Sequence, residues 1–214
     1  MGHAFRLCTL DLDGTLLPGT AFLAVAQALG KADEVRRLDA LYARGEMTLR
    51  DNFHAEYALL VGTPVAEAEA ALRKGPWLAN IPAGVARLRG LGLRVGLLTD
   101  QPDFLARLAE PTLDPVLCSL GGVAAGRIAP VKEYREDKAA HLRAWCKANQ
   151  VDLEQVIHCG NGRNDLPVFE RVGLGVAVNP DSPEVARRAD LAIEGVKDLR
   201  EVAEVVERAL REGL

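Results

Sequence analysis

The chain has 214 residues, of which 49% are hydrophobic and 26% charged, with 20 glycines and 11 prolines. This composition is typical of a folded globular protein, and the length allows one α/β domain with a sizeable core, with or without a smaller insertion, but not two independent full-sized domains. The formal net charge is −4 and no segment gathers Lys and Arg into a basic stripe, so nucleic acid is not an expected partner.

The sequence shows no sign of a membrane protein or a disulfide framework. It contains no basic segment followed by a long apolar run and no stretch of about 20 apolar residues, so we expect a soluble, cytoplasmic protein without membrane association. The four cysteines form no CxxC pair, and most lie in or beside apolar segments, which predicts reduced structural thiols. They are Cys8, Cys118, Cys146 and Cys159.

Short apolar segments rich in Val, Leu and Ile alternate with longer segments of helical periodicity. This alternation predicts an α/β fold with a Rossmann-like parallel sheet core covered by helices. The expected strands, in chain order, are Phe5–Leu10, Leu93–Leu98, Pro115–Ser119, Gln155–Cys159, Leu174–Val178 and Leu191–Ile193. The helices expected between and after them are Ala83–Leu91, Asp137–Asn149, Leu166–Arg171, Pro183–Arg188 and Leu199–Arg211.

One region, from about Phe22 to Arg73, breaks the alternation because it has helical patterns but no convincing strand. Its four amphipathic segments, separated by Gly or Pro signals, are Ala21–Leu29, Asp33–Arg44, Leu49–Leu60 and Val65–Leu72. We interpret residues 19–79 as an inserted helical-bundle cap, and residues 1–18 and 80–214 as the core domain. Because the insertion follows the first strand, the cap should lie over the carboxyl ends of the strands, where ligands bind in open α/β sheets.

The first motif, Asp11-Leu12-Asp13-Gly14-Thr15, follows the first expected strand without a gap. Residues two apart at a strand end project to the same side, so Asp11 and Asp13 should share one small volume. Two carboxylates this close repel each other unless a cation or a shared proton relieves them, and the pair would suit Mg²⁺. The alternative is an ordinary Asp-Gly turn in which Asp13 only supports the backbone.

Two weaker signals lie further along the chain. Thr99 and Asp100 end the second core strand, where a hydroxyl and backbone amides could hold a phosphate oxygen; the alternative for Thr99 is a β-former or a helix cap. Lys138 begins an expected helix directly after the strongly charged segment 132–137, and the alternative for it is a solvated surface charge.

The last motif, Gly160-Asn161-Gly162-Arg163-Asn164-Asp165, lies between the strand Gln155–Cys159 and a helix. It matches only the first two glycines of a dinucleotide fingerprint and comes late in the chain, so a nucleotide cofactor is not expected. Small glycines around Asn161 permit a tight loop that points Asn161 and Asp165 at the first pair of aspartates. A plain Gly-Asn turn is the alternative.

Together, in this order, the DxDGT motif, Thr99, Lys138 and the GxGxND loop, whose Asn161 lies 23 positions after Lys138, resemble the haloacid dehalogenase superfamily. The resemblance spans nearly the whole chain. The helical insertion after the first motif resembles that superfamily's first type of cap, and the branch that the chain resembles is the phosphoserine phosphatase-like one.

The resemblance implies a phosphatase that uses Mg²⁺ and hydrolyses a small phosphorylated metabolite through an aspartyl phosphate on Asp11. Asp13 would act as general acid and base, while Thr99 and Lys138 would hold the phosphoryl oxygens. The implied metal ligands are Asp11, Asp13, Asn161 and Asp165. The candidate phosphate- and substrate-binding residues are Gly14, Thr15, Asp100 and Asn164 from the core and Glu56 from the cap.

Two departures from the family pattern bear on function. Asn161 stands where the family usually has a metal-binding aspartate, so weaker Mg²⁺ binding is expected. The Glu and Arg with which phosphoserine phosphatases recognise their substrate correspond by register to Thr20 and Glu56, and Glu56 would repel a carboxylate, so phosphoserine is not the expected substrate. Glu56, with His54 and Tyr57 on or near one helical face, could instead line a pocket for hydroxyls or an amine, or face solvent.

The sequence therefore predicts a phosphoric monoester hydrolase that is not specific for phosphoserine. Two alternatives remain open: a phosphotransferase or mutase that uses the same intermediate, and a catalytically weak phosphometabolite-binding protein, which Asn161 suggests. The sequence gives no prediction of the oligomeric state.

Overall fold

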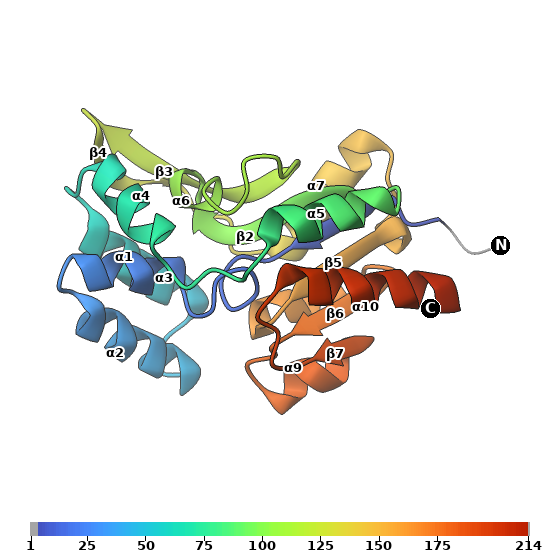
Figure 1. Cartoon of the computed structure of the whole chain (residues 1–214). Helices are drawn as coiled ribbons and strands as arrows, with labels where there is room; N and C mark the ends of the chain where they lie inside the picture. The colour runs from blue at the N-terminus through green and yellow to red at the C-terminus, as the bar shows by residue number, and fades with distance from the viewer. Residues whose placement is uncertain (1–3, 214) are drawn as a thin grey trace.

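The computed structural model describes residues 4–213. Its framework is a seven-stranded sheet in the order β4-β3-β2-β1-β5-β6-β7 (Figure 1). The strands are β1 (Leu7–Leu10), β2 (Arg94–Pro102), β3 (Val116–Ala124), β4 (Arg127–Glu133), β5 (Val156–Gly160), β6 (Leu174–Val178) and β7 (Leu191–Ile193). Neighbouring strands pair in parallel except β3 and β4, which are antiparallel. The predicted α/β fold is confirmed.

Helices cover both faces of the sheet, which explains why its central strands are continuously apolar. On one face lie α5 (Ile81–Gly90) and α10 (Leu199–Glu212), and α10 buries residues spaced three and four apart: Leu199, Val202, Ala203, Val206 and Ala209. On the other face lie α7 (Lys138–Asn149), α8 (Leu166–Phe169) and α9 (Pro183–Arg188). The short elements α6 (Asp103–Ala106), η1 (Leu153–Gln155) and η2 (Arg163–Asp165) complete the core.

The segment between β1 and α5 forms four helices beyond one end of the sheet (Figure 1). They are α1 (Ala21–Ala28), α2 (Ala32–Ala43), α3 (Leu49–Leu60) and α4 (Val65–Arg73), close to the four predicted segments. Phe22, Phe53 and Leu72 pack inside this cap and belong to the same apolar cluster as the sheet residues Leu10 and Leu97. The apolar interior therefore continues from the core into the cap.

The antiparallel hairpin of β3 and β4 was not predicted. The segment 120–134 mixes glycines, charged residues and Pro130 without a clear alternation, and β4 is an edge strand, where a proline is tolerated because one side of the strand needs no ladder partner. The hairpin turns at Ala125 and Gly126, both with positive φ. Long-range pairing with β3, rather than the local pattern, stabilises this strand.

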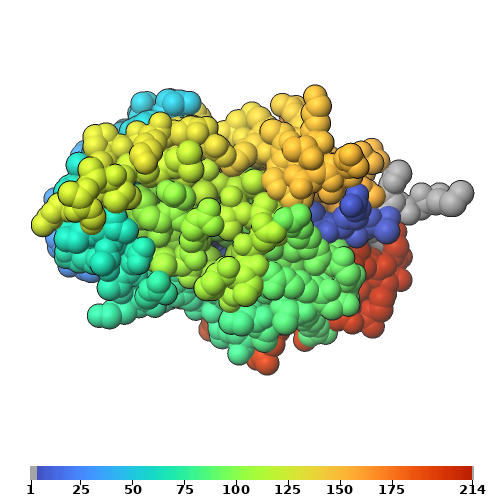
Figure 2. Space-filling model, turned by 90° about the horizontal axis from the view of Figure 1, so that it is seen from above, coloured from blue at the N-terminus to red at the C-terminus, as the bar shows by residue number. Residues whose placement is uncertain are grey.

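The hairpin lies against the cap, as the yellow and cyan surfaces at one end of Figure 2 show. Gly62 N donates to the Ile128 carbonyl (2.8 Å), Ile128 N donates to the Thr63 carbonyl (2.9 Å), and Val65 N donates to the Gly126 carbonyl (3.0 Å). The cap is thus held to the core by backbone hydrogen bonds as well as by its two connecting segments.

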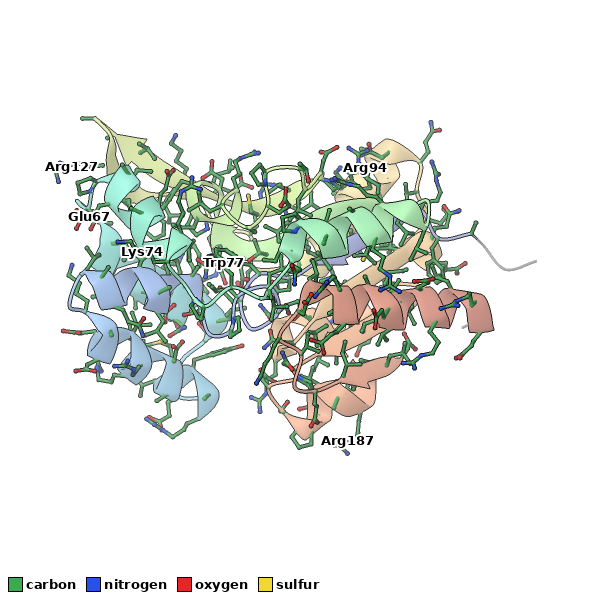
Figure 3. The ribbon with its side chains drawn as sticks, viewed as in Figure 1. Glu67, Lys74, Trp77, Arg94, Arg127 and Arg187 are labelled. Atoms are coloured by element: carbon green, nitrogen blue, oxygen red, sulfur yellow. The ribbon has the colours of Figure 1, made fainter. Side chains whose placement is uncertain are left out.

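One side chain joins the hairpin to the cap, and another holds the end of the cap where the chain returns to the core (Figure 3). Arg127, at the tip of the hairpin, donates to the Gly62 carbonyl (2.7 Å). Trp77, where the chain returns to the core, donates from Nε1 to the Leu72 carbonyl (2.9 Å) at the end of α4.

The four cysteines are buried and free, which agrees with structural thiols. Within residues 4–213, no helix has the length and apolar character needed to cross a membrane.

We expect the hydroxyl of Tyr57 to stabilise the attachment of the cap. It accepts from Gly122 N (2.9 Å) and donates to the Ala129 carbonyl (3.0 Å) in the hairpin. Tyr57→Phe would leave a buried amide without an acceptor, which costs about 1–3 kcal/mol, and should lower the Tm by several degrees in a thermal melt. Tyr134→Phe is the control, because the Tyr134 hydroxyl is buried without a partner among the described residues, and its removal should leave the Tm unchanged or raised. Equal effects of the two substitutions would contradict this assignment.

Candidate active site

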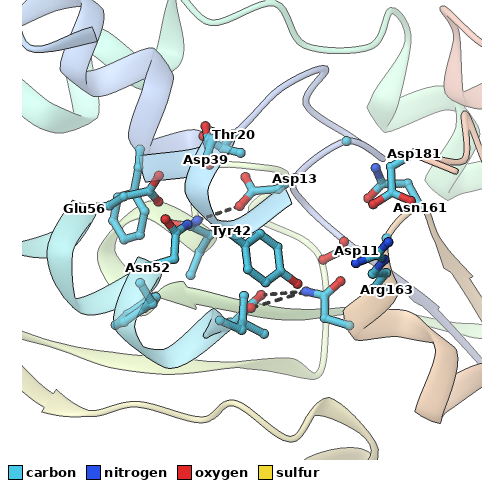
Figure 4. Close-up of a pocket in the computed structure, with 18 of the residues that line it drawn as sticks. Asp11, Asp13, Thr20, Asp39, Tyr42, Asn52, Glu56, Asn161, Arg163 and Asp181 are labelled. Atoms are coloured by element: carbon cyan, nitrogen blue, oxygen red, sulfur yellow. Dashed lines mark hydrogen bonds between the residues drawn. The ribbon is translucent and has the colours of Figure 1, made fainter. Parts of the chain in front are cut away.

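The carboxyl ends of β1, β2 and β5 meet the cap around one pocket of about 270 Å³ (Figure 4). From the core, Asp11, Asp13 and Gly14 follow β1, Asp100 and Gln101 lie near the end of β2, and residues 161–164 follow β5. From the cap, Thr20, Asp39, Tyr42, Asn52 and Glu56 line the opposite wall. The volume suits a small ligand.

Beneath the pocket, a buried ammonium group joins two aspartates. Lys138 Nζ lies 2.8 Å from Asp11 Oδ1 and 2.8 Å from Asp165 Oδ1, and the three side chains are at most 3% exposed. Lys138 is the first residue of α7, which Asp137 caps by accepting a hydrogen bond from Ala140 N (2.8 Å). This hydrogen bond from Ala140 N to Asp137 fixes where α7 begins, and α7 in turn places Lys138 at the end of β1. The alternative prediction, that Lys138 is a solvated surface charge, is wrong.

The groups of this cluster shift one another's pKa values in both directions. Burial raises the pKa of Asp11 well above its ordinary value, Asp165 adds to the rise, and the Lys138 ammonium opposes it. Burial alone would lower the pKa of Lys138, but Asp11 and Asp165 outweigh burial and raise it. Lys138 therefore stays protonated and is the positive charge nearest to the carboxyl of Asp11.

Both carboxylate oxygens of Asp165 make polar contacts. Burial alone would raise its pKa, but Lys138 and His158 outweigh burial and keep the pKa of Asp165 well below its ordinary value. His158 Nε2 lies 3.0 Å from Oδ1, while Oδ2 accepts from Asn161 N (2.9 Å) and Gly162 N (3.0 Å). Because both carboxylate oxygens are engaged and the residue is fully buried, this geometry argues against the expected role of Asp165 as a metal ligand. Asp165 instead positions Lys138 and the loop after β5.

Sequence reasoning missed His158, whose position in a buried apolar strand was the available signal. On β5 it is 0% exposed, and its Nδ1 lies 2.9 Å from the hydroxyl of Thr9 on β1. The two ring nitrogens thus face Thr9 and Asp165, which fixes the ring orientation. His158 is a positioning residue behind Asp165.

Asp13 faces the pocket in a different environment from Asp11. Its Oδ1 accepts from Ala21 N at the start of α1 (2.7 Å), and its Oδ2 accepts from Gln101 Nε2 (2.5 Å). Burial raises the pKa of Asp13 to about 7, although the hydrogen bond from Ala21 opposes the shift. A carboxyl with this pKa can both give and take a proton near neutral pH. Gln101 was not predicted, and only its place two residues after Thr99 hinted at it.

The loop after β5 approaches the first motif closely. Gly14 has a positive φ of 72°, and a Cβ atom there would lie 1.9 Å from Nδ2 of Asn161. Only glycine allows Asn161 to sit against the backbone of the DxDGT motif. A Cβ atom on Gly160 would likewise lie 2.4 Å from Cγ of Asp165. The predicted close approach of this loop to Asp11 and Asp13 is present.

The rim of the pocket carries further charged and polar groups. Asn164 Nδ2 lies 3.3 Å from Asp100, whose other neighbour is Lys138 at 3.9 Å. Arg163 and Asp181 also line the pocket, and both were missed in the sequence. Asp181 N donates to the Asn161 carbonyl (2.9 Å), so Asp181 and Asn161 lie side by side (Figure 4).

The predicted site residues form two groups. Those that line the pocket are Asp11, Asp13, Gly14, Asp100, Asn161, Asn164 and Glu56. Thr15, Thr99, Lys138 and Asp165 are buried behind its wall. The Thr99 hydroxyl accepts from Gln101 N (3.2 Å) and is close to the site through that contact.

On α3, only one of the three suggested cap residues reaches the pocket. Glu56 lines it, whereas Tyr57 faces the hairpin and His54 is exposed beside Phe53 and Tyr134. His54 therefore takes the predicted solvent-facing alternative, because residues 54 and 56 are separated by about 200° around a helix. Tyr57, about 100° from Glu56, takes neither predicted alternative and faces the hairpin. Asn52, four residues before Glu56, shares its face, and this spacing was the signal that sequence reasoning overlooked.

Oxygen atoms around Asp11 could hold a hard cation. Asp11 and Asn161 line the pocket, and the backbone carbonyl of Asp13 belongs to the motif whose Gly14 lies against Asn161. Carboxylate, carbonyl and amide oxygens are the donors that Mg²⁺ accepts. Over residues 4–213, no cluster of three or more His, Cys, Asp or Glu side chains has a metal-binding arrangement.

Comparisons with known proteins agree with this geometry. Residues 8–170 match the family model of haloacid dehalogenase-like hydrolases. The chain is 32% identical over 204 residues to a phosphoserine phosphatase of Streptomyces coelicolor, covering 89% of this chain and 48% of that protein. It is 30% identical over 207 residues to a phosphoserine phosphatase of Halobacterium salinarum, covering 92% and 96%. The chain spans about half the length of the first two curated relatives that it matches.

Solved structures show the same fold. A phospho-aspartyl intermediate analogue of phosphoserine phosphatase superimposes with a TM-score of 0.82 at 22% identity, covering 95% of this chain and 99% of that one. A HAD family hydrolase from Salmonella enterica serovar Typhi gives a TM-score of 0.85 at 18% identity, covering 95% and 72%.

The network around Asp165 yields a stability prediction. Asp165→Asn would turn an amide group toward Lys138 or the loop amides and leave Lys138 with one close carboxylate, so we expect a loss of about 3 kcal/mol or more. Chemical denaturation measures the free energy of unfolding. Asp181→Asn, at an exposed carboxyl beside the same loop, should change it by no more than about 0.5 kcal/mol. A small effect of Asp165→Asn would mean that the network does not stabilise the fold.

Proposed function

This chain belongs to the haloacid dehalogenase-like hydrolase family, and from that premise we propose that it is a Mg²⁺-dependent phosphatase that hydrolyses a small phosphate monoester through an aspartyl phosphate on Asp11. The observation that carries the proposal is the pairing of Asp11 and Asp13 at one pocket in unlike environments. Lys138 lies against Asp11, while Asp13 accepts hydrogen bonds from Ala21 and Gln101. Two carboxyls with separate environments can take separate roles.

In the first step, a carboxylate oxygen of Asp11 attacks phosphorus and the bond to the ester oxygen breaks. Asp13 gives its proton to the leaving oxygen, for which its pKa of about 7 is suitable. In the second step, Asp13 takes a proton from water as the water attacks phosphorus, which frees Asp11 and inorganic phosphate. The hydrogen bonds from Ala21 and Gln101 keep Asp13 pointed into the pocket through both steps.

Charge on the transferring phosphoryl group needs positive partners. We assign this role to the ammonium of Lys138 and to the hydroxyl of Thr99, which accepts from Gln101 N and has its own proton left to donate. Six carboxyls line the described pocket against one guanidinium, that of Arg163, so a phosphate dianion would be repelled without a further cation.

Mg²⁺ would supply that positive charge, held by Asp11, the Asp13 carbonyl and Asn161. Because Asn161 offers a neutral oxygen, the site has less negative charge than one with an aspartate there. Asp181, which lies beside Asn161, is the residue we propose to compensate.

The substrate is proposed to be a phosphate monoester other than phosphoserine, although the relatives at 30–32% identity are phosphoserine phosphatases. The support is chemical: Glu56 and Asp39 line the cap wall, and the described lining of the cap contains no Lys or Arg to receive a carboxylate. We further propose that the protein acts in the cytoplasm, as the sequence predicts.

Phosphate release from p-nitrophenyl phosphate tests the role of Asp11. Asp11→Asn should lower the rate by a factor on the order of 10³ or more because an amide cannot form the intermediate. Asp33→Asn, at an exposed carboxyl on the cap surface, should retain the rate. Turnover by the Asp11→Asn protein would refute the mechanism, and added alcohol that collects the phosphoryl group in place of water would identify a phosphotransferase.

A Mg²⁺ titration tests the role of Asn161. Asn161→Asp should lower the Mg²⁺ concentration for half-maximal activity by roughly tenfold, since a carboxylate replaces a neutral oxygen. Asp181→Asn should raise it. Unchanged titrations in both variants would exclude these two side chains from the metal site, whereas activity found only in Asn161→Asp would identify the wild-type protein as a binding protein.

A further inference from the structure

The cap wall of the pocket contains a polar cluster that the proposed chemistry does not use. Asp39 from α2 and Asn52 and Glu56 from α3, here called the cap triad, face the pocket across from Asp13 (Figure 4). Asn52 is 6% and Glu56 3% exposed, so the apolar residues around them, among them Phe22 and Phe53, shield them from bulk water.

Two acceptors of the cap triad lack a donor. Glu56 Oε1 and Asn52 Oδ1 are buried and have no hydrogen-bond partner anywhere in the described chain. A buried polar atom left without a partner costs about 1–3 kcal/mol, and each such atom in a native structure needs an explanation. Because both atoms belong to residues that line the pocket, a bound ligand can provide the missing donors.

The other contacts of the cap triad lie within it. Asp39 and Asn52 lie close enough to Glu56 to shift its pKa, the charge of Asp39 raising it and Asn52 lowering it. Burial, with the charge of Asp39 second, raises the pKa of Glu56 to about 10. Because its pKa is about 10, Glu56 is mainly protonated at neutral pH, so the two carboxyls together carry at most about one negative charge.

The missing ligand group must match this charge and these acceptors. A hydroxyl has one donor and no charge, a carboxylate has the wrong charge, and a quaternary ammonium has no donor. A primary ammonium has one positive charge and three donors, enough for Glu56 Oε1, Asn52 Oδ1 and one further acceptor in the triad. Asp13 lies across the pocket and also raises the pKa of Glu56.

We propose that the cap triad of Asp39, Asn52 and Glu56 binds a primary ammonium group, so that the substrate is the phosphate monoester of a small amino alcohol without a carboxylate. This assignment rests on the phosphatase activity proposed above and names the class of substrate for the same pocket. The phosphate lies at Asp11 and the ammonium at the cap wall, which selects a short molecule with the two groups at opposite ends.

Calorimetric binding with Mg²⁺ present tests the proposal without relying on turnover. The probes are 2-aminoethyl phosphate and 2-hydroxyethyl phosphate, which differ only in the terminal group. The wild-type protein should bind the amino ester roughly ten- to a hundredfold more tightly, the size expected for hydrogen bonds between charged groups. The N,N,N-trimethyl analogue, which keeps the charge and loses the donors, should bind more weakly than the primary amine.

Variants then test the residues. Glu56→Gln should remove at least about tenfold of the preference for the amino ester, and Asp39→Asn serves as a second variant in case the first does not fold. Glu67→Gln makes the same chemical change at an exposed site of the cap, on α4 (Figure 3), and should leave the preference unchanged. Equal binding of the two esters by wild type, or a full preference retained in Glu56→Gln, would overturn the proposal.

O-phosphoserine and p-nitrophenyl phosphate complete the test. O-phosphoserine adds a carboxylate to the amino ester and should bind more weakly; tighter binding would overturn the assignment to an amino alcohol. Hydrolysis of p-nitrophenyl phosphate reports on the phosphatase activity alone. A preference for the amino ester without any hydrolysis would refute the proposed function and support the ammonium site, whereas hydrolysis without the preference would do the opposite.

Discussion

The site depends on one buried cation between two buried carboxylates. Lys138 brings α7, the end of β1 and the loop after β5 to one point because its ammonium lies 2.8 Å from both Asp11 and Asp165. Any one of these three groups buried without its partners would strongly destabilise the folded state. Together they satisfy one another, and His158 and the loop amides complete the shell of Asp165. The nucleophile proposed for the reaction is therefore fixed by the same contacts that close the fold.

The pocket above this cluster has unusual electrostatics. Its described walls carry mainly acidic groups, from the core at Asp11, Asp13 and Asp100 and from the cap at Asp39 and Glu56. The proposed phosphate ester would need cations to offset this charge, and we propose Mg²⁺ for that role at the core wall and a substrate ammonium at the cap wall. The hairpin holds the cap through Tyr57 and Arg127, so the two walls face each other in a defined arrangement.

Local sequence patterns predicted the buried apolar strands well. They predicted less well the elements that depend on pairing with residues far away in the chain. Strands such as β6 and β7 match their predicted bounds because they are apolar runs between turn signals. The hairpin strand β4 was missed, since β3 and the cap stabilise it rather than its own sequence. Asp39 and His158 were missed for a similar reason: each acts through a partner far away in the chain, Glu56 in one case and Thr9 in the other.

The sequence by itself determined the α/β class and the residue types of the DxDGT motif and the GxGxND loop, because alternation and turn chemistry are local properties. Only the tertiary structure decided which oxygens stay free. It buried Asp165 behind Lys138 and left Glu56 and Asn52 unsatisfied in the cap wall. The physical reason is that the availability of a polar atom depends on desolvation and on donors supplied by other elements, and neither is written in the spacing of residues along the chain.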